Sequence, residues 1–290
     1  MKILVLGCKG QLGRCLNDQL KKTDYEVIYT SREQIDITKF EATKDKLFDI
    51  APDVIINATA FTAVDKAEEE QEAANLINHL SVKNIADICN QLNCWLFHVS
   101  TDYVFDGSSQ IPYKEDFQTN PQSIYGKTKL NGELAIQTAG CKHIIIRTAW
   151  LFSEYGSNFF KTMLLLGAER EEISVVDDQV GCPTYAQDIA VAVVKILPHL
   201  GSHNCISGIY NYSGDSACSW FQLAEEIFHQ MSKYPQRSIP IVKAISSDEF
   251  PSLVHRPHFS VLNSGLIEKV FGIGPSDWKS GVASSLKRLL

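Results

Sequence analysis

A tyrosine and a lysine, Tyr125 and Lys129, stand four residues apart in the segment SIYGKTKLNGE. Residues at positions i and i+4 lie on the same face of a helix. The pKa of a free tyrosine, about 10, is too high for efficient proton transfer at neutral pH, and a nearby ammonium lowers it. The spacing predicts a proton donor with its electrostatic partner, although it also fits two solvated side chains on an ordinary helix.

A hydroxyl and a carboxylate, Thr101 and Asp102, follow the apolar run Trp95–Val99. In open α/β sheets, ligands bind beyond the carboxyl ends of the strands. We expect Thr101 to fix a carbonyl oxygen by a hydrogen bond. Tyr125 would then protonate that oxygen while a nicotinamide delivers hydride to its carbon.

Three glycines, Gly7, Gly10 and Gly13, follow the expected strand Lys2–Leu6 in the turn GCKGQLG. Glycines permit a sharp turn and a close approach to a pyrophosphate, and the helix N-terminus offers free N–H groups to the phosphates. The spacing differs from the usual G-x-G-x-x-G, and a tight turn without a ligand is the alternative. Its place between a strand and a helix favours dinucleotide binding.

The second expected strand ends in Tyr29-Thr30-Ser31-Arg32, without the acid that usually holds the adenine ribose. Arg32, with Ser31, could instead meet a 2′-phosphate, which favours NADPH or the use of both NADPH and NADH. The alternative is a solvated arginine. Asp36 and Ile37 lie close enough downstream to border the adenine.

The segments that must position these residues alternate between short apolar runs and helical patterns. Continuous apolar strands separated by helices indicate a parallel sheet covered on both faces, so the fold class is α/β, a doubly wound, Rossmann-type sheet. We expect strands at Lys2–Leu6, Glu26–Tyr29, Asp53–Asn57, Trp95–Val99 and His143–Arg147, and helices at Gln11–Lys21, Lys39–Phe48, Ala67–Asn90 and Tyr125–Thr138.

The alternation weakens after Arg147, which predicts a smaller lobe interwoven with the first. We expect residues 1–150, joined by about 173–215, to form the NADP(H)-binding domain, and residues 151–172 and 216–290 to form a substrate-binding lobe. The elements expected there are helices at Asn158–Leu166, Asp188–Leu197 and Trp220–Gln230, strands at Ile173–Val176 and Gly208–Tyr212, and Pro-rich turns before a final short helix.

Composition places the chain among soluble globular proteins. It has 290 residues, 44% of them hydrophobic, and a net charge of −7, which argues against nucleic-acid binding. No apolar stretch has the length of a signal-peptide core or a membrane span. The eight cysteines and eight histidines show no metal-binding spacing. We expect reduced packing thiols, no metal site, no membrane partner and a cytoplasmic location.

The motifs together resemble the extended short-chain dehydrogenase/reductases and, among them, the dTDP-4-dehydrorhamnose reductases. The resemblance covers most of the chain. It is carried by GCKGQLG, DVIINATAFTAVDKAE, STDYVFDG, YGKTKLNGE, IIRTAWLFSEYGSNF, VVDDQVGCPTY, GIYNYSG and RPHFSVLNS. It implies reduction of the 4-keto group of dTDP-4-dehydro-L-rhamnose by NAD(P)H, giving dTDP-L-rhamnose.

The resemblance also implies roles for single residues. The catalytic set is Thr101, Tyr125 as proton donor, and Lys129, which in that family also holds the nicotinamide ribose. The nucleotide-sugar substrate would meet Thr101, Asp102 and Trp150. The implied cofactor residues are Gly10, Gln11, Leu12, Asp36, Ile37, Ala60, Phe61, Thr62, Tyr125 and Lys129.

Three further residues have two readings each. Trp150 follows the fifth strand and could pack against a sugar or base, or it could be a core residue. Arg256, in a Pro-bounded loop, could pair with a diphosphate or be a surface arginine. Asn158 could touch substrate, but a helix cap is the favoured reading.

Departures from the family leave other functions open. Some relatives are dimers joined by magnesium through an acid just after the glycine turn, but Arg14-Cys15-Leu16 stands there, so a monomer or a metal-free homodimer is expected. A sugar dehydratase would need an Asp-Glu pair where Asp102-Tyr103 stands. The alternatives are another nucleotide-sugar epimerase or reductase, and a non-catalytic NADP-binding regulatory subunit resembling that of methionine adenosyltransferase.

Overall fold

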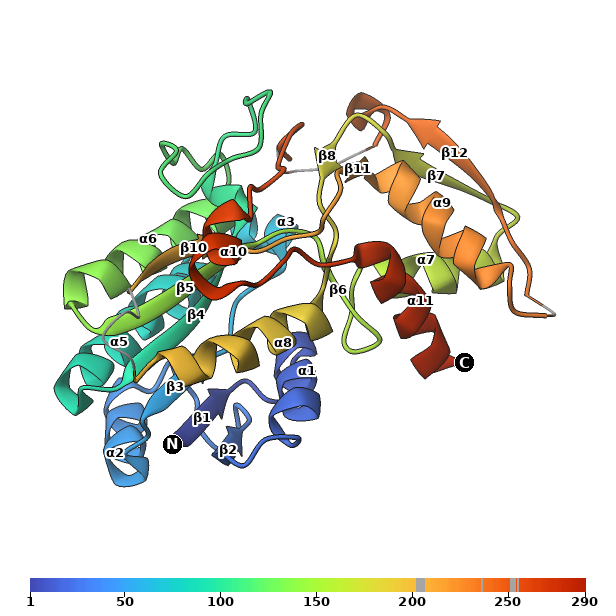
Figure 1. The fold of residues 1–290 in the computed structure, drawn as a ribbon. Helices are drawn as coiled ribbons and strands as arrows, with labels where there is room; N and C mark the ends of the chain where they lie inside the picture. The colour runs from blue at the N-terminus through green and yellow to red at the C-terminus, as the bar shows by residue number, and fades with distance from the viewer. Residues whose placement is uncertain (202–206, 236, 251–253, 255) are drawn as a thin grey trace.

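The fold is centred on a six-stranded sheet in which every neighbouring pair is parallel (Figure 1). The computed structural model describes residues 1–201, 207–235, 237–250, 254 and 256–290. The strand order confirms the doubly wound α/β fold. Across the sheet the strands are β10 (Gly208–Asn211), β5 (Lys142–Thr148), β4 (Trp95–Thr101), β3 (Val54–Asn57), β1 (Lys2–Leu6) and β2 (Glu26–Thr30).

Helices cover both faces of this sheet because its strands are apolar on both sides. In β1, Ile3 and Val5 pack into the core on one face, and Leu4 and Leu6 pack into the core on the other. Burial on both faces explains why these strands read as continuous apolar runs. The first face carries α1 (Gln11–Leu20), α8 (Ala186–Ile196) and α10 (Gly265–Phe271), and the second carries α2 (Phe40–Ile50), α5 (Ser81–Leu92) and α6 (Ile124–Ala139).

The long connection between β3 and β4 is helical, as predicted, but it is divided. It contains α3 (Val64–Glu69), α4 (Gln71–Asn75) and a π-helical turn (Leu76–Leu80) before α5. The side chain of Asn78, in the π-helical turn, accepts a hydrogen bond from Phe61 N at 2.8 Å and donates one to Phe61 O at 3.1 Å. The loop after β3 is thereby fixed to the helical layer.

A smaller lobe packs its own core beside the sheet, at the right of Figure 1. Its helices are α7 (Phe159–Glu169), α9 (Trp220–Met231) and α11 (Trp278–Leu289), and its two-stranded parallel sheet pairs β7 (Glu172–Val176) with β12 (Ile241–Ile245). The prediction of turns alone before the final helix was wrong, because β12 forms by pairing with a strand that is distant in sequence. For the same reason β7, which begins near the expected boundary at residue 173, lies outside the six-stranded sheet.

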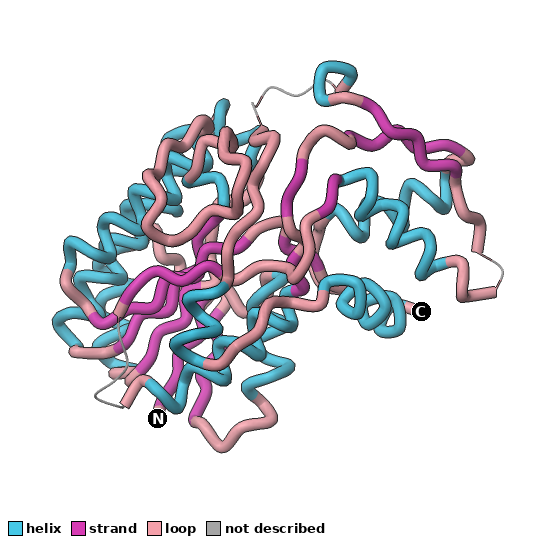
Figure 2. Tube along the Cα trace, turned by 45° about the horizontal axis from the view of Figure 1, so that its top comes forward, coloured by secondary structure: helices cyan, strands magenta, loops and turns pink. Residues whose placement is uncertain are grey.

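Short strand pairs connect the two lobes (Figure 2). β6 (Leu151–Phe152) pairs with β9 (Thr184–Tyr185), and β8 (Val180–Gly181) pairs with β11 (Cys218–Ser219). The strand β10 joins the main sheet beside β5, which confirms its expected place. Short helical turns occupy Asp102–Val104, Leu197–His199 and Ser247–Glu249.

Two further findings concern the chain as a whole. No helix within the described residues combines the length and apolar character that crossing a membrane requires. Six of the seven described cysteines are buried, as packing residues are.

Candidate active site

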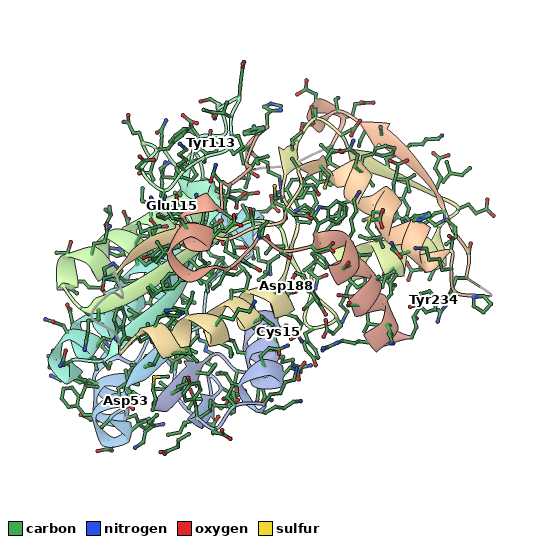
Figure 3. The ribbon with its side chains drawn as sticks, viewed as in Figure 1. Cys15, Asp53, Tyr113, Glu115, Asp188 and Tyr234 are labelled. Carbon is green, nitrogen blue, oxygen red and sulfur yellow. The ribbon has the colours of Figure 1, made fainter. Side chains whose placement is uncertain are left out.

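The candidate site is a cleft at the carboxyl ends of the strands, beside β1 and β3. From β1 the chain continues to β2 on one side, and from β3 it continues to β4 on the other side, so the strand order reverses between β1 and β3. Such a switch in strand order is the usual place for a ligand in an open α/β sheet. In Figure 3, Asp53 lies at the opposite edge, before β3, whereas Tyr113 and Glu115 lie on the loop between β4 and α6. The cleft has a volume of about 610 Å³ and is lined by the start of α1, the ends of β3, β4 and β5, and residues of the smaller lobe.

The glycine turn forms one wall of the cleft. Gly7 has φ of +81°, and a Cβ there would lie 2.9 Å from Cγ2 of Thr59. A Cβ on Gly13 would lie 2.2 Å from the carbonyl oxygen of Gly7, so α1 begins directly against the turn. Gly10, Gln11 and Leu12 line the cleft. The first turn of α1, Gln11-Leu12-Gly13-Arg14, carries no acid that would neutralise its positive end. These features fit a bound pyrophosphate.

Tyr125, Lys129 and Thr101 all line the same cleft. The i,i+4 spacing predicted the shared position of Tyr125 and Lys129, and the end of the strand predicted that of Thr101. Ser123 begins α6 by accepting a hydrogen bond from Gly126 N at 3.1 Å. Gly126 packs so closely on the turn after β4 that a Cβ there would lie 2.2 Å from the carbonyl oxygen of Tyr103. This contact fixes the start of α6 against the end of β4, and Tyr125 and Thr101 both line the cleft there.

The expected lowering of the Tyr125 pKa by Lys129 was wrong. Burial raises the pKa of Tyr125 to about 12; the hydrogen bond with Thr101 opposes this rise and the charge of Asp102 adds to it. Lys129 points its amine elsewhere, with Nζ 2.5 Å from Val99 O and 3.2 Å from Nε2 of His98. Its own pKa is lowered to about 8 by burial, against the charge of Glu133.

Asp102 brings a buried carboxyl to the cleft. Burial raises the pKa of Asp102 to about 6, although hydrogen bonds from Ser260 and Thr101 oppose the rise. Among the buried side-chain atoms that the structure describes, Asp102 Oδ2, Ser100 Oγ and Thr148 Oγ1 lack a hydrogen-bond partner, and all three residues line the cleft. Buried polar groups are normally paired, so these atoms point to a polar ligand.

Aromatic rings form the wall on the side of the smaller lobe. Trp150 has φ of +48° and lies parallel to Trp220, with ring centroids 3.5 Å apart. Phe159 adds a tilted contact to Trp220 at 4.7 Å. Trp150 is partly exposed and lines the cleft, and it also packs against the buried core of the smaller lobe. We did not identify Phe159 or Trp220 from the sequence; each directly follows a helix-capping residue, a weak signal for a site.

Asn158 is the helix cap that we expected, because its Oδ1 accepts a hydrogen bond from Lys161 N at 3.1 Å. Its Nδ2 also donates to Oε1 of Gln11 at 2.6 Å, which ties the smaller lobe to the glycine turn. Arg256 lines the cleft as well and pairs with Asp65 at 2.9 Å. Its Nε is a further buried atom without a partner among the described residues.

Several of the remaining predicted cofactor residues lie outside the residues that line the cleft. Ala60 and Thr62 line it, but Phe61 between them does not. Arg32 lies on the surface with its Nε 3.7 Å from Asp36. The other residues outside the lining are Gly7, Ser31, Asp36 and Ile37.

An acid that we missed lies beside the end of β2. Ser31 donates a hydrogen bond to the carboxylate of Glu33, and Lys9 of the glycine turn contacts the same carboxylate at 3.1 Å. Glu33 stands three residues after the end of β2, later than the position at which we looked for an acid. The side chains of Ser31 and Glu33 therefore already satisfy each other.

Comparison with known proteins identifies the family. A family model described as the RmlD substrate binding domain matches residues 1–290. The chain belongs to this family. A dTDP-4-dehydrorhamnose reductase of Aggregatibacter actinomycetemcomitans is 40% identical over 285 residues, which cover 96% of each chain.

Solved structures of RmlD-type proteins share the whole fold. A dTDP-4-dehydrorhamnose reductase from Clostridium acetobutylicum has a TM-score of 0.93 at 38% identity, covering 100% of this chain and 99% of its own. The same enzyme type from Bacillus anthracis, in complex with NADP, has a TM-score of 0.91 at 34% identity, covering 99% of both chains. A UDP-glucose 4-epimerase from Thermus thermophilus, 18% identical, shares the fold alone.

Proposed function

We propose that this protein reduces the 4-keto group of dTDP-4-dehydro-L-rhamnose with NADPH, and with NADH as a second cofactor, to give dTDP-L-rhamnose. The observation that carries the proposal is the convergence of Tyr125, Thr101 and Lys129 in one cleft beside the glycine turn. Relatives of the same length that bear the reductase name support the choice of substrate.

The cofactor would lie across the switch point between β1 and β3. The N-terminus of α1, with Gly10, Gln11 and Leu12, would hold the pyrophosphate, and Ala60 and Thr62 would border the rest of the dinucleotide. The residues that would also contribute to cofactor binding are Gly7, Ser31, Arg32, Asp36, Ile37 and Phe61. A bound nicotinamide supplies the hydride that reduces the carbonyl carbon.

Tyr125 would act as the proton donor. With a pKa of about 12, its hydroxyl is protonated across the neutral range and holds the proton that the new alcohol needs. Thr101, which lines the same cleft as Tyr125, would fix the position of the substrate oxygen. Lys129 would orient the nicotinamide ribose from its place on the next turn of α6.

The nucleotide sugar would enter from the smaller lobe. The unpaired atoms of Asp102 and Arg256 would meet its polar groups, and the edge of Trp150 would border the sugar. A second cavity of about 900 Å³ shares Phe159, Trp220 and Arg256 with the cleft, so the two spaces adjoin and offer room for the nucleotide.

We propose two lobes that follow this division of labour. Residues 1–150, with α8 and β10, would bind the cofactor, and the region of α7, β7, β12, α9 and α11 would bind the substrate. We further propose that the enzyme works in the cytoplasm as a monomer or homodimer.

The test is to mix the purified protein with NADPH and dTDP-4-dehydro-L-rhamnose and to follow the loss of the reduced nicotinamide absorbance. Formation of dTDP-L-rhamnose, identified by mass and NMR, is the expected result. NADPH binding without turnover would instead favour the regulatory-subunit alternative, and turnover only with other 4-keto nucleotide sugars would move the substrate assignment.

A further inference from the structure

A group of three polar side chains lies where the glycine turn meets the end of β2. Two backbone N–H groups of the turn donate to the carbonyl oxygen of Thr30, at 2.9 and 3.0 Å, and hold the turn against this strand end. Lys9 of the turn and Ser31, the first residue after β2, both contact the carboxylate of Glu33. Gly10, which follows Lys9, lines the cleft, so the group adjoins the cofactor side of the site.

The carboxylate of Glu33 is held as an anion by two donors. Ser31 donates its hydroxyl hydrogen to Oε2 of Glu33, and Nζ of Lys9 lies 3.1 Å from the same oxygen. The hydrogen bond from Ser31 and the neighbouring Lys9 lower the pKa of Glu33 to about 2. A hydroxyl and an ammonium that hold a carboxylate oxygen can hold a phosphate oxygen in the same way.

The three side chains differ in their freedom to move. Ser31 is 4% exposed, so packing fixes its position. The side chains of Lys9 and Glu33 are 70% and 71% exposed, and neither is held by surrounding atoms. The carboxylate can therefore leave Ser31 and Lys9 without any change in the fold.

The position of Glu33 is that of an acid that meets the adenine ribose. In dinucleotide-binding folds the acid that accepts a hydrogen bond from the ribose 2′-hydroxyl stands about 20 residues after the glycine turn, as Glu33 does after Gly13. Asp36 is engaged elsewhere, because its Oδ1 accepts hydrogen bonds from Thr38 N at 3.1 Å and from Thr38 Oγ1 at 2.7 Å. Glu33 is therefore better placed than Asp36 to meet the ribose.

We propose that Lys9 and Glu33 determine the choice between NADPH and NADH by an exchange of partners. With NADH, Glu33 stays on Lys9 and Ser31 and accepts a hydrogen bond from the free 2′-hydroxyl. With NADPH, Lys9 and Ser31 bind the 2′-phosphate, and Glu33 turns into solvent. This inference rests on the proposed use of both cofactors, and it makes Glu33 the residue that admits NADH and limits the affinity for NADPH.

The charges of the group set the size of the effect. A 2′-phosphate and the Glu33 carboxylate repel each other, so NADPH must displace Glu33 from Lys9 before it gains the ammonium. Solvent and salt screen exposed charges, and exposed ion pairs are weak, so a change of about three- to fivefold in affinity is the expected size. Arg32, whose Nε lies 3.7 Å from Asp36, is a second exposed cation that favours the phosphate.

Titration of the purified protein measures this choice without any sugar substrate. The fluorescence of the reduced nicotinamide gives Kd for NADPH and NADH, and calorimetry gives Kd for adenosine 2′,5′-bisphosphate and for AMP. In Glu33→Gln, Kd for NADPH should fall about three- to fivefold and Kd for NADH should rise, because an amide is a weaker acceptor than a carboxylate. In Lys9→Met, Kd for NADPH should rise about three- to fivefold, with little change for NADH. The bisphosphate should follow NADPH, and AMP should follow neither shift of NADPH.

The double variant separates an exchange of partners from simple repulsion. In a Lys9→Met background there is no ammonium to release, so Glu33→Gln should improve NADPH binding much less than it does in the wild type. An equal gain in both backgrounds would overturn the exchange. The matched control is Glu26→Gln, which makes the same change at the other end of β2, where Glu26 is 66% exposed and lies 4.0 Å from Lys2. We expect Glu26→Gln to leave both Kd values unchanged, and a shift equal to that of Glu33→Gln would reduce the effect to net charge and refute the proposal.

Failure of this inference is distinguishable from failure of the proposed function. If the wild type reduced the keto sugar while Glu33→Gln kept the wild-type ratio of the two Kd values, the function would stand and this inference would fall. If the predicted shifts occurred in a protein that reduces no sugar, the inference would stand and the reductase function would fall. A wild type that binds neither cofactor would overturn both.

Discussion

Trp150 stacks on Trp220 with ring centroids 3.5 Å apart and planes only 6° from parallel. Trp150 follows β5 of the large sheet, and Trp220 is the first residue of α9 in the smaller lobe. The pair therefore joins the two lobes at the wall of the cleft. The same stack therefore packs the lobes together and forms part of the cleft wall.

Replacing Trp220 with alanine should weaken substrate binding and leave cofactor binding nearly unchanged. Aromatic pairs contribute roughly 0.5–1.5 kcal/mol beyond their buried area, so KM for the nucleotide sugar should rise about tenfold through the loss of the Trp150 orientation. Steady-state kinetics and NADPH titration measure the two effects. Phe221→Ala, at the next position of α9, is the control because Phe221 lines neither cavity. If KM for the nucleotide sugar were similar in the two variants, the prediction would be contradicted.

Replacing Tyr125 with phenylalanine should remove most turnover, since it removes only the transferable proton. General acid catalysis typically contributes roughly 10²- to 10⁴-fold in rate, and we expect a loss of kcat in that range with NADPH affinity retained. Tyr103→Phe is the control, because its ring contacts that of Tyr125 edge to face at 5.5 Å and its change also removes a cleft hydroxyl. Near-normal turnover in Tyr125→Phe would exclude Tyr125 as the proton donor.

Asp102→Asn should stabilise the fold at neutral pH. The pKa of Asp102 is raised to about 6 in the folded state, against about 4 for an unfolded aspartate. The unfolded chain therefore releases this proton first, and Asp102 lowers the stability of the wild type as pH rises from about 4 to 6. A difference of that size between the folded and unfolded pKa values corresponds to a loss of roughly 3 kcal/mol in the free energy of unfolding.

Chemical denaturation at pH 4 and pH 7 would check this prediction, with the gain from Asp102→Asn present at pH 7 and small at pH 4. Asp18→Asn should behave in the opposite way. Hydrogen bonds from Tyr155, Gln187, Lys21 and Arg288 outweigh its burial and lower the pKa of Asp18 to about 2, so its carboxylate contributes stability that is present above about pH 4 and lost as pH falls toward 2. If Asp102→Asn changed the free energy of unfolding equally at pH 4 and pH 7, burial would not be what destabilises the Asp102 carboxylate.

The sheet and the placing of Tyr125 and Lys129 in one cleft were predictable because they depend on local patterns. Apolar runs mark β1, β3, β4 and β5, and the i,i+4 spacing places Tyr125 and Lys129 on one face of α6. Features that depend on pairing between distant segments were not predictable. Such features are β12, the Trp150–Trp220 stack and the contact of His98 with Lys129.

The direction of the Tyr125 pKa shift shows why spacing alone did not suffice. Two side chains on one helix face share a cleft, but the groups that they contact decide their charges. Lys129 reaches the carbonyl of Val99 on β4, and burial then determines the pKa of Tyr125. Contacts such as that between Lys129 and Val99 depend on how α6 packs against β4, and a single sequence does not specify this packing.

Arg147→Met should destabilise the protein strongly, since it leaves Glu133 as a buried charge without its partner. The two side chains are 3% and 1% exposed and form a two-fold contact, and Arg147 also donates to Glu115 O at 3.2 Å. Breaking such a pair costs about 3–5 kcal/mol, measurable as a lower free energy of unfolding in urea. Arg147→Met combined with Glu133→Leu should recover much of this loss, because the pair as a whole contributes little net stability.

The surface pair Lys83–Asp87, with side chains 56% and 40% exposed, is the matched control: Lys83→Met should change stability by less than about 1 kcal/mol. If the two single variants lost similar amounts, burial would not be the source of the effect.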